Sequence, residues 1–155
     1  MTAHPSRDET RAAYRQFLAI PTRWMDNDVY GHVNNVVYYS YFDTAVNKWL
    51  IDQGLLDYLN GETIGLVVQT ACSYFRPVAF PDVIHAGLRV AHLGRSSVRY
   101  EVGLFRNHEA TVAAAGHFTH VYVNRRDNRP SPIAEAMRAA LQTLMAPPAH
   151  DGHQA

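Results

Sequence analysis

A short segment, residues 26–35, combines reactive side chains with the start of a helix. It contains two carboxylates, a glycine, a histidine and two asparagines, and a long apolar segment follows it directly. The first turn of a helix carries unpaired backbone N–H groups and partial positive charge, which together can stabilise an oxyanion. A carboxylate a few residues upstream can be directed at the same place. The segment therefore predicts a site for acyl transfer or hydrolysis.

Each of these residues also has a structural interpretation. Asp28 could interact with the helix dipole alone, and we expect Asp26 to be a structural carboxylate of the loop. Gly31 is expected to provide a backbone conformation or a close approach that other residues cannot. His32 could orient a substrate or a water molecule, and an ordinary hydrogen-bonded histidine is the alternative. Asn34 is expected to cap the helix or fix the loop, as could the side chain of the next residue.

The hydrophobic pattern places one long helix between strands. We expect a strand over residues 14–24 and a helix over residues 33–53, ended by Gly54. Four further strands follow, over residues 63–75, 83–93, 97–106 and 111–124, and a last helix begins at Ser131-Pro132 and runs to about residue 145. The long helix has a single polar stripe, made of Ser40, Asp43, Thr44, Asn47, Lys48 and Asp52.

This order of elements predicts an α+β fold. Four successive strands with short turns indicate an antiparallel sheet. A largely apolar helix must then be buried on one face of that sheet. We therefore expect a curved five-stranded antiparallel sheet wrapped around a central helix, with a second helix at the C-terminal end. The domain is expected over residues 14–146, between a flexible arm (residues 1–13) and a flexible tail (residues 147–155).

Composition excludes several classes of protein. The chain has 155 residues, of which 47% are hydrophobic, and its net charge is zero with neutral histidines. It is large enough for one domain with a core, and the zero charge gives no support for binding to nucleic acid or an anionic membrane. There is no segment long enough to span a membrane and no signal peptide near the start. With a single cysteine, these features predict a cytoplasmic protein.

The residues around this segment resemble a known family. The run from Arg23 to Asn35, followed by Tyr38 and Tyr41-Phe42-Asp43, is similar to the signature of the 4-hydroxybenzoyl-CoA thioesterase-like acyl-CoA thioesterases, which have the hotdog fold. Weaker matches, Tyr74-Phe75-Arg76-Pro77 and Leu93-Gly94-Arg95-Ser96-Ser97, occur in the expected order. The resemblance extends over about residues 14–145.

The resemblance implies hydrolysis of an acyl-CoA thioester to a free acid and CoA. Asp28 would attack directly to give a mixed anhydride, or would act as the base that positions water. The backbone N–H of Asn35 would hold the oxyanion, with Gly31 and His32 completing the catalytic set. Substrate binding would fall to Asn34, Thr70, Arg95, Ser96 and Ser97, of which the last three lie in a loop that contacts the CoA nucleotide in the family. A solvated turn is the alternative for that loop.

The resemblance further implies a homodimer or homotetramer, because sites of this family form between two subunits, with Thr70 facing the site across the interface. We expect no cofactor and no metal. His117 and His120 would project from opposite faces of their strand, which makes a poor metal site. Cys72 is expected to be a buried small hydrophobe rather than a catalytic thiol.

Two other functions stay open at this point. One is a hydratase or dehydratase acting on acyl thioesters with the same fold, for which His32 beside Asp28 would be the reacting pair. The other is a protein that binds acyl-CoA or an acyl carrier protein without catalysis. The sequence does not specify the acyl group or its carrier.

Overall fold

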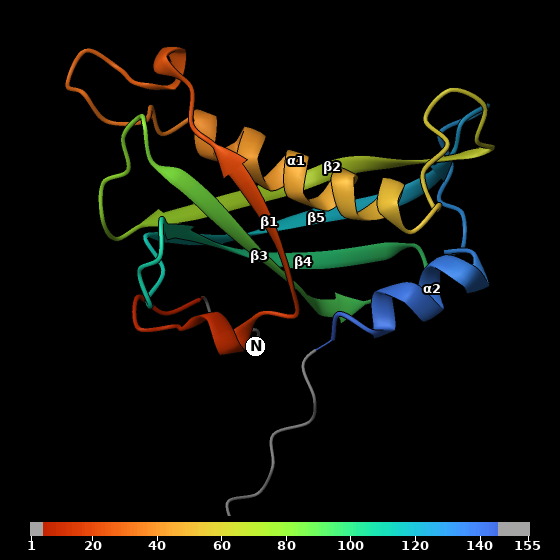
Figure 1. Cartoon of the computed structure of the whole chain (residues 1–155). Coiled ribbons are helices and arrows are strands. Elements are labelled where there is room, and N and C mark those ends of the chain that lie inside the picture. Colours follow the sequence, from red (N-terminus) through yellow and green to blue (C-terminus); the bar gives the residue numbers. More distant parts are fainter. Residues whose placement is uncertain (1–4, 146–155) are drawn as a thin grey trace, which may run out of the picture.

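The computed structural model describes residues 5–145, which form a curved antiparallel sheet with one long helix lying across it (Figure 1). The strands are β1 (Gln16–Pro21), β2 (Thr63–Tyr74), β3 (Val83–Leu93), β4 (Ser97–Arg106) and β5 (Ala114–Asn124). The helices are α1 (Val37–Asp52) and α2 (Glu135–Gln142), with 3₁₀ turns at Arg11–Ala13 and Trp24–Asp26. The expected α+β class and hotdog fold are confirmed. The predicted tail lies outside the described residues.

The order of strands in the sheet is β1-β3-β4-β5-β2, and every neighbouring pair is antiparallel. The two edge strands are therefore β1 and β2. Pro21 lies at the end of β1, where an edge strand tolerates a residue that cannot donate a backbone hydrogen bond.

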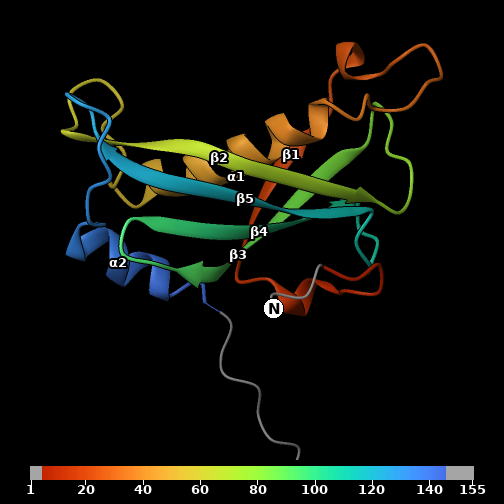
Figure 2. The same ribbon diagram turned by 180° about the vertical axis from the view of Figure 1, so that it is seen from behind.

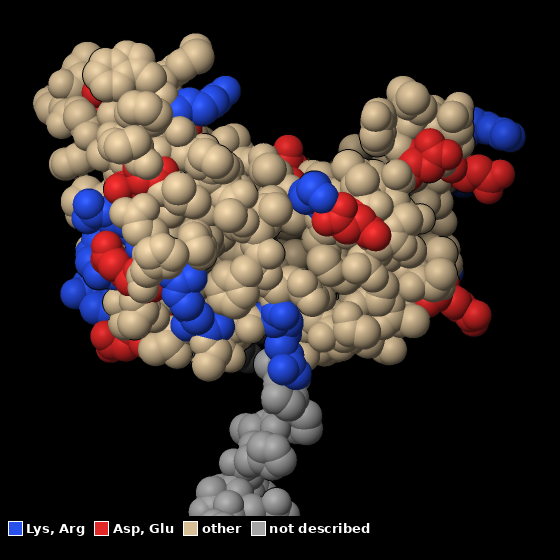
Figure 3. Space-filling view, in the orientation of Figure 1, with Lys and Arg blue, Asp and Glu red and all other residues tan. Residues whose placement is uncertain are grey.

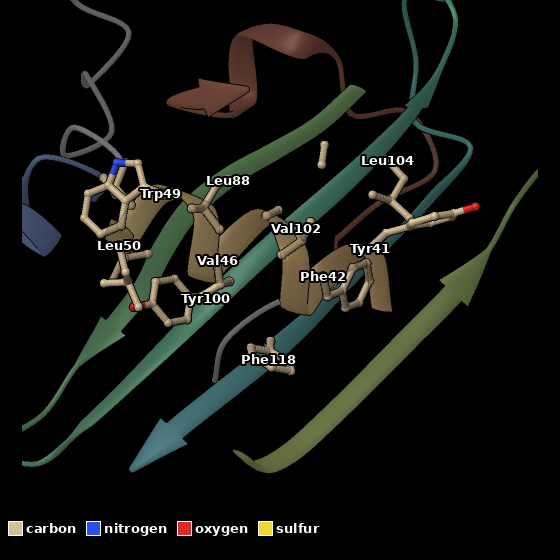
Figure 4. Packing of buried hydrophobic residues seen from close by; sticks show 14 of the residues in the cluster. Tyr41, Phe42, Val46, Trp49, Leu50, Leu88, Tyr100, Val102, Leu104 and Phe118 are labelled. Carbon is tan, nitrogen blue, oxygen red and sulfur yellow. The ribbon is translucent and has the colours of Figure 1, made fainter. Parts of the chain in front are cut away.

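The long helix is held to the sheet by a stripe of buried side chains with helical spacing. From α1 these are Tyr38, Tyr41, Phe42, Ala45, Val46, Trp49 and Leu50. They meet side chains of β3, β4 and β5 such as Leu88, Tyr100 and Phe118 (Figure 4). Burying each large side chain contributes about 1.5–3 kcal/mol, which fixes the helix across the sheet. The helix ends as expected at Gly54, which has a φ of +70°.

One bulge decides which side chains of β2 face α1. The register of β2 on β5 shifts between Val67 and Gln69. Gly65 is opposite Tyr122 before the shift, and Thr70 is opposite Phe118 after it. Both partners on β5 are buried on the α1 side of the sheet, and directly opposed residues share a face. Because of the extra residue, the odd-numbered side chains before the bulge and the even-numbered side chains after it both face the helix.

The C-terminal helix starts later than the sequence predicts. The expected cap at Ser131-Pro132 is wrong, because α2 begins at Glu135 after Ala134, with no side-chain cap. Backbone pairing with the sheet keeps the preceding residues extended: the Ser131 N–H donates to Tyr122 O, and the Ile133 N–H to Arg95 O.

Residues 5–13, where the sequence predicts a flexible arm, lie on the face of the sheet away from α1 (Figures 1 and 2). The Arg89 guanidinium bridges Glu9 and Glu101 at 2.8 and 2.9 Å. Arg11 donates to the backbone carbonyl groups of Asn107 and Glu109. These bonds satisfy charged groups that would otherwise be left on a half-buried face of the sheet.

Candidate active site

The loop that leads into α1 is anchored by a buried carboxylate. Asp26 is 1% exposed. Its Oδ2 accepts hydrogen bonds from the Arg23 backbone N–H (2.8 Å) and the Tyr41 hydroxyl (2.9 Å), and its Oδ1 from Arg23 Nε (3.0 Å). Burial by itself would raise the pKa of Asp26, but these hydrogen bonds and the charge of Arg23 outweigh it and lower the pKa. Asp26 is thus a structural carboxylate, as expected.

Between Asp26 and α1 the chain forms a tight loop that contains Asp28. The Asp28 N–H donates to His32 O at 2.8 Å, and the Gly31 N–H donates to Asp28 O at 3.1 Å. Gly31 has a φ of +80°, and a Cβ built on it would have no atom within 4 Å. The glycine is therefore needed for its backbone conformation rather than for close approach.

One oxygen of the Asp28 carboxylate is fixed. Its Oδ1 accepts a hydrogen bond from the Tyr30 backbone N–H at 2.8 Å. Within the described part of the chain, Oδ2 accepts none. The side chain is thus oriented by one oxygen while the other is left for a ligand.

The start of α1 leaves one backbone donor unused. The N–H groups of Val36 and Val37 donate to the side-chain and backbone oxygens of Asn34 at 3.2 and 2.9 Å. Among residues 5–145, the Asn35 N–H has no acceptor. Asn34 therefore fixes the residues just before α1, whose N-cap is Val36 without a side-chain cap; its role in substrate binding stays a prediction. The carbonyl of Asn35 accepts from the Tyr74 hydroxyl at 3.0 Å, which ties the end of β2 to the helix start.

A groove of about 470 Å³ runs beside this helix start. Its lining brings together three predicted catalytic residues, Asp28, His32 and Asn35. The other lining residues are Val33, Tyr38, Tyr74, Phe75, Arg76 and Pro77. The loop and the start of α1 project at one end of the molecule (Figure 1), and in the space-filling view the surface is hollowed between the two projecting ends, with acidic and basic residues interspersed on this face (Figure 3).

Sequence reasoning assigned no role to two lining residues, Tyr74 and Arg76. The Arg76 guanidinium donates to Thr111 O and Oγ1 at 2.5 and 2.9 Å and lies 2.6 Å from Glu109 Oε1. A fixed cation thus shares the groove with Asp28. The run Tyr74 to Pro77 was visible as a match to the family, but only folding brings the end of β2 to the start of α1.

The other predicted binding residues are not in this groove. Thr70 is half-buried on β2, on the face toward α1. Arg95 and Ser96 lie in the turn from β3 to β4 and Ser97 begins β4, next to α2 and at the far end of the molecule from the Asp28 loop (Figure 1). They do not line the groove, so their role in binding stays a prediction.

The remaining candidates show no sign of catalysis. Cys72 is half-buried, and burial raises the pKa of its thiol to about 12, so the thiol is protonated at neutral pH. Within residues 5–145 no group of histidine, cysteine or acidic side chains is arranged to hold a metal ion. No helix in that range is long and apolar enough to cross a membrane.

Comparison with known proteins gives the class to which this fold and site belong. The model of the thioesterase-like superfamily matches residues 22–141, which is most of the chain. The chain therefore belongs to the thioesterase-like superfamily. No curated protein matches the sequence significantly.

Solved structures agree with this assignment. The chain is similar to the PA5185 protein from Pseudomonas aeruginosa strain PAO1, with 53% identity over 93% of this chain and 98% of that one and a TM-score of 0.87. It is also similar to the PA2801 protein of Pseudomonas aeruginosa, a proposed thioesterase, with 32% identity over 83% and 98% of the two chains and a TM-score of 0.76. A gentisyl-coenzyme A thioesterase, BH1999, shares the fold at 22% identity, with coverage of 81% and 99% and a TM-score of 0.73.

Proposed function

We propose that this protein hydrolyses an acyl-CoA thioester, with Asp28 as the reacting carboxylate. The observation that carries the proposal is that Asp28 and Asn35 line the same groove, one with an unoccupied carboxylate oxygen and the other with an unused backbone N–H. A thioester carbonyl held between them would meet a nucleophile or an activated water on one side and a hydrogen-bond donor on the other. CoA is supported as the carrier by the family and by the named thioesterase of the same fold.

The steps follow from the roles of these groups. Asp28 attacks the carbonyl carbon, or removes a proton from the water that does so. Negative charge then develops on the carbonyl oxygen and is stabilised at the start of α1. The C–S bond breaks, and the CoA thiolate leaves and takes up a proton. In the direct route, water then hydrolyses the mixed anhydride on Asp28.

The test is thiol release from a panel of short, long and aryl acyl-CoA substrates. We expect Asp28→Asn to lower kcat by at least about 100-fold, since a positioned acid or base contributes that much, with an unchanged circular dichroism spectrum. Asp43→Asn, an exposed carboxylate on α1, is the matched control and should keep its activity. Equal kcat/KM for Asp28→Asn and wild type would refute the role of Asp28.

Two alternative outcomes would reassign the site. Hydration of 2-enoyl-CoA without thiol release would indicate a hydratase, and saturable acyl-CoA binding with no reaction would indicate a binding protein.

We propose further that the protein is a homodimer formed through β2. This edge strand exposes Leu66, Val67, Val68 and Tyr74, with exposed fractions of 40–59%. Exposed apolar edge strands invite pairing with another chain. Two copies of β2, related by a two-fold axis at the middle of the strand, would join the two sheets into one. A cytoplasmic location and a further tetramer stay predictions.

A further inference from the structure

The residue with the unused backbone N–H, Asn35, belongs to two peptide units. In the unit that joins Asn34 to Asn35, the carbonyl accepts from the Val37 N–H at 2.9 Å, and the N–H at its other end has no acceptor in the described part of the chain. The unit that joins Asn35 to Val36 is held at both ends by side chains. Its N–H donates to Asn34 Oδ1 at 3.2 Å, and its carbonyl accepts from the Tyr74 hydroxyl at 3.0 Å.

Tyr74 is the one of these partners that comes from a distant segment. It lies at the end of β2, 39 residues from Asn35 in the sequence, and is paired with Ala114 in the sheet. In the described part of the chain, no other hydrogen bond joins residues 35–37 to a segment outside the Asp28 loop and α1. The Tyr74 hydroxyl therefore fixes the start of the helix relative to the sheet, whereas the bonds made by Asn34 fix it only relative to the loop.

The hydroxyl is itself well oriented. The Tyr74 ring packs against Tyr38, which is 3% exposed, with centroids 4.8 Å apart and planes at 89°, an arrangement that aromatic pairs favour. Because a carbonyl group only accepts, the hydroxyl must be the donor in its bond to Asn35. Burial raises the pKa of Tyr74, so the hydroxyl keeps its proton at neutral pH. Replacement by phenylalanine would keep the ring and remove only this donor.

The position of the Asn35 N–H matters because an oxyanion forms only as the reaction proceeds. A donor stabilises it best when it is already held about 2.7–3.1 Å from where the charged oxygen will be. A donor that is free to shift adapts to the uncharged carbonyl of the bound substrate and loses part of this preference. Interactions that are stronger in the transition state than in the bound substrate raise kcat and leave KM unchanged.

We propose that Tyr74 is a positioning residue of the site, whose hydroxyl, by binding the Asn35 carbonyl, holds the Asn35 N–H where the oxyanion forms. This inference rests on the proposed thioesterase function. In this role Tyr74 acts through the backbone of Asn35 and does not contact the reacting atoms. The Asn34 side chain holds the opposite end of the same peptide unit.

Kinetics of Tyr74→Phe test this role. Loss of a whole oxyanion donor lowers kcat by about 10²–10³-fold, so a donor that is present but less firmly held should lower it by about 10-fold. We expect KM to stay within about twofold of wild type. Tyr58→Phe is the matched control, because it removes a hydroxyl from a side chain that is 65% exposed and outside the groove, and it should keep its kcat. A wild-type kcat in Tyr74→Phe, or an effect confined to KM, would overturn the proposal.

The stretching frequency of the bound carbonyl separates positioning from a general structural effect. Hexanoyl-CoA and benzoyl-CoA, labelled with a heavy carbon isotope at the carbonyl, are bound to Asp28→Asn so that they are not turned over, and infrared difference spectra are recorded. A hydrogen bond from Asn35 lowers the frequency relative to the free thioester. We expect a smaller lowering when Tyr74→Phe is added and no change when Tyr58→Phe is added. Equal frequencies with and without the Tyr74 hydroxyl would refute the role.

Failure of the proposed function gives a different result from failure of this inference. If thiol is released from acyl-CoA but Tyr74→Phe changes neither kcat nor the carbonyl frequency, only the positioning role fails. If no acyl-CoA is hydrolysed, the same spectra of the wild-type complexes are decisive. A lowered frequency that returns toward the free value in Tyr74→Phe would support the role by itself. No lowering in wild type, or the same lowering in both proteins, would refute it.

Discussion

Asp26 and Asp28 are two residues apart in the same loop, and their surroundings give them different tasks. Asp26 is buried, and both of its oxygens accept hydrogen bonds from Arg23 or Tyr41. Asp28 lines the groove, with one oxygen held by a backbone N–H. A carboxylate with every acceptor occupied stabilises the loop, whereas one with an unoccupied oxygen can react. The chemistry of the site depends on this division.

Gly31 permits the turn that presents Asp28, and its replacement should be costly for a backbone reason. Its φ of +80° is unfavourable for residues with a Cβ, although there is space for one. We expect Gly31→Ala to lower the free energy of unfolding by about 1–2 kcal/mol, and Gly31→Asn by less, because asparagine tolerates this conformation. Urea titration of the three proteins measures this. Equal stability of Gly31→Ala and wild type would show that the loop does not depend on the glycine.

His120 makes stability depend on pH in a defined range. Burial lowers its pKa from 6.5 to about 4 in the folded protein. Between these values the unfolded chain binds a proton that the folded chain does not, so the free energy of unfolding falls as the pH decreases from about 6.5 to 4. The full loss is about 3 kcal/mol at about 1.4 kcal/mol per pKa unit.

We therefore expect the stability of His120→Phe to vary less with pH over this range than that of wild type. Urea titrations at several pH values measure the difference. Burial and the nearby Arg11 also lower the pKa of His85, which acts in the same direction in both proteins. Parallel pH profiles for wild type and variant would contradict the burial of a neutral His120.

At the scale of elements, the bulge gives the two halves of β2 the same face. Gly65 borders a hollow of about 140 Å³ near the end of α1 and Tyr74 borders the Asp28 groove, and both face α1 only because one extra residue lies between Val67 and Gln69. Regular alternation would turn one of the two halves outward. A strand with a single apolar face could not supply both sites.

Deletion of Val68 should therefore be far more damaging than its truncation. Without the extra residue, one half of β2 must turn its α1-facing side chains away from the helix, either Gly65 and Val67 or Thr70, Cys72 and Tyr74. We expect the deletion variant to lose about 3 kcal/mol of stability, while Val68→Ala, which keeps the register of the strand and removes only two methyl groups, loses about 1 kcal/mol. Thermal unfolding compares them. A deletion variant as stable as Val68→Ala would contradict this account of the strand.

At the scale of the whole molecule, the two edges of the sheet differ. The short β1 ends in Pro21, whereas β2 has twelve residues and exposes large apolar side chains along its middle. Proline and short length protect an edge from pairing with another chain. The asymmetry favours β2 as the interface between two copies of the protein.

A lysine at the centre of β2 should separate these copies. The proposed axis brings the two residues at position 68 together, so Val68→Lys would place like charges against each other in the interface. We expect wild type to be a dimer and Val68→Lys a monomer by light scattering coupled to size exclusion, with thioesterase activity lost because the binding residues are shared. Ala19→Lys, exposed on the opposite edge, is the control and should remain dimeric and active. A dimeric Val68→Lys would place the interface elsewhere.

Much of this protein could be read from local patterns. The β-branched and apolar runs of β2 to β5, the helical spacing from Tyr38 to Leu50 and the glycine after α1 predict the elements and the fold, because each depends on neighbours in the chain. The Asp28 loop was identifiable for the same reason, since its residues lie within ten positions of one another. The start of α2 was not, because backbone pairing with distant strands outweighs the local capping preference of Ser131-Pro132.

Only the tertiary structure decided what surrounds these residues. It brings Tyr74 and Arg76 to the start of α1, separates residues 95–97 from Asp28, and encloses His120, whose Nδ1 has no hydrogen-bond partner among residues 5–145. It also reveals the bulge that gives both halves of β2 the same face. Such relations depend on register and on contacts between segments far apart in the chain. The spacing of residues within one segment does not specify such contacts. Composition and periodicity therefore predict the scaffold and the candidate carboxylate Asp28. Packing determines the shape and polarity of the groove beside Asp28.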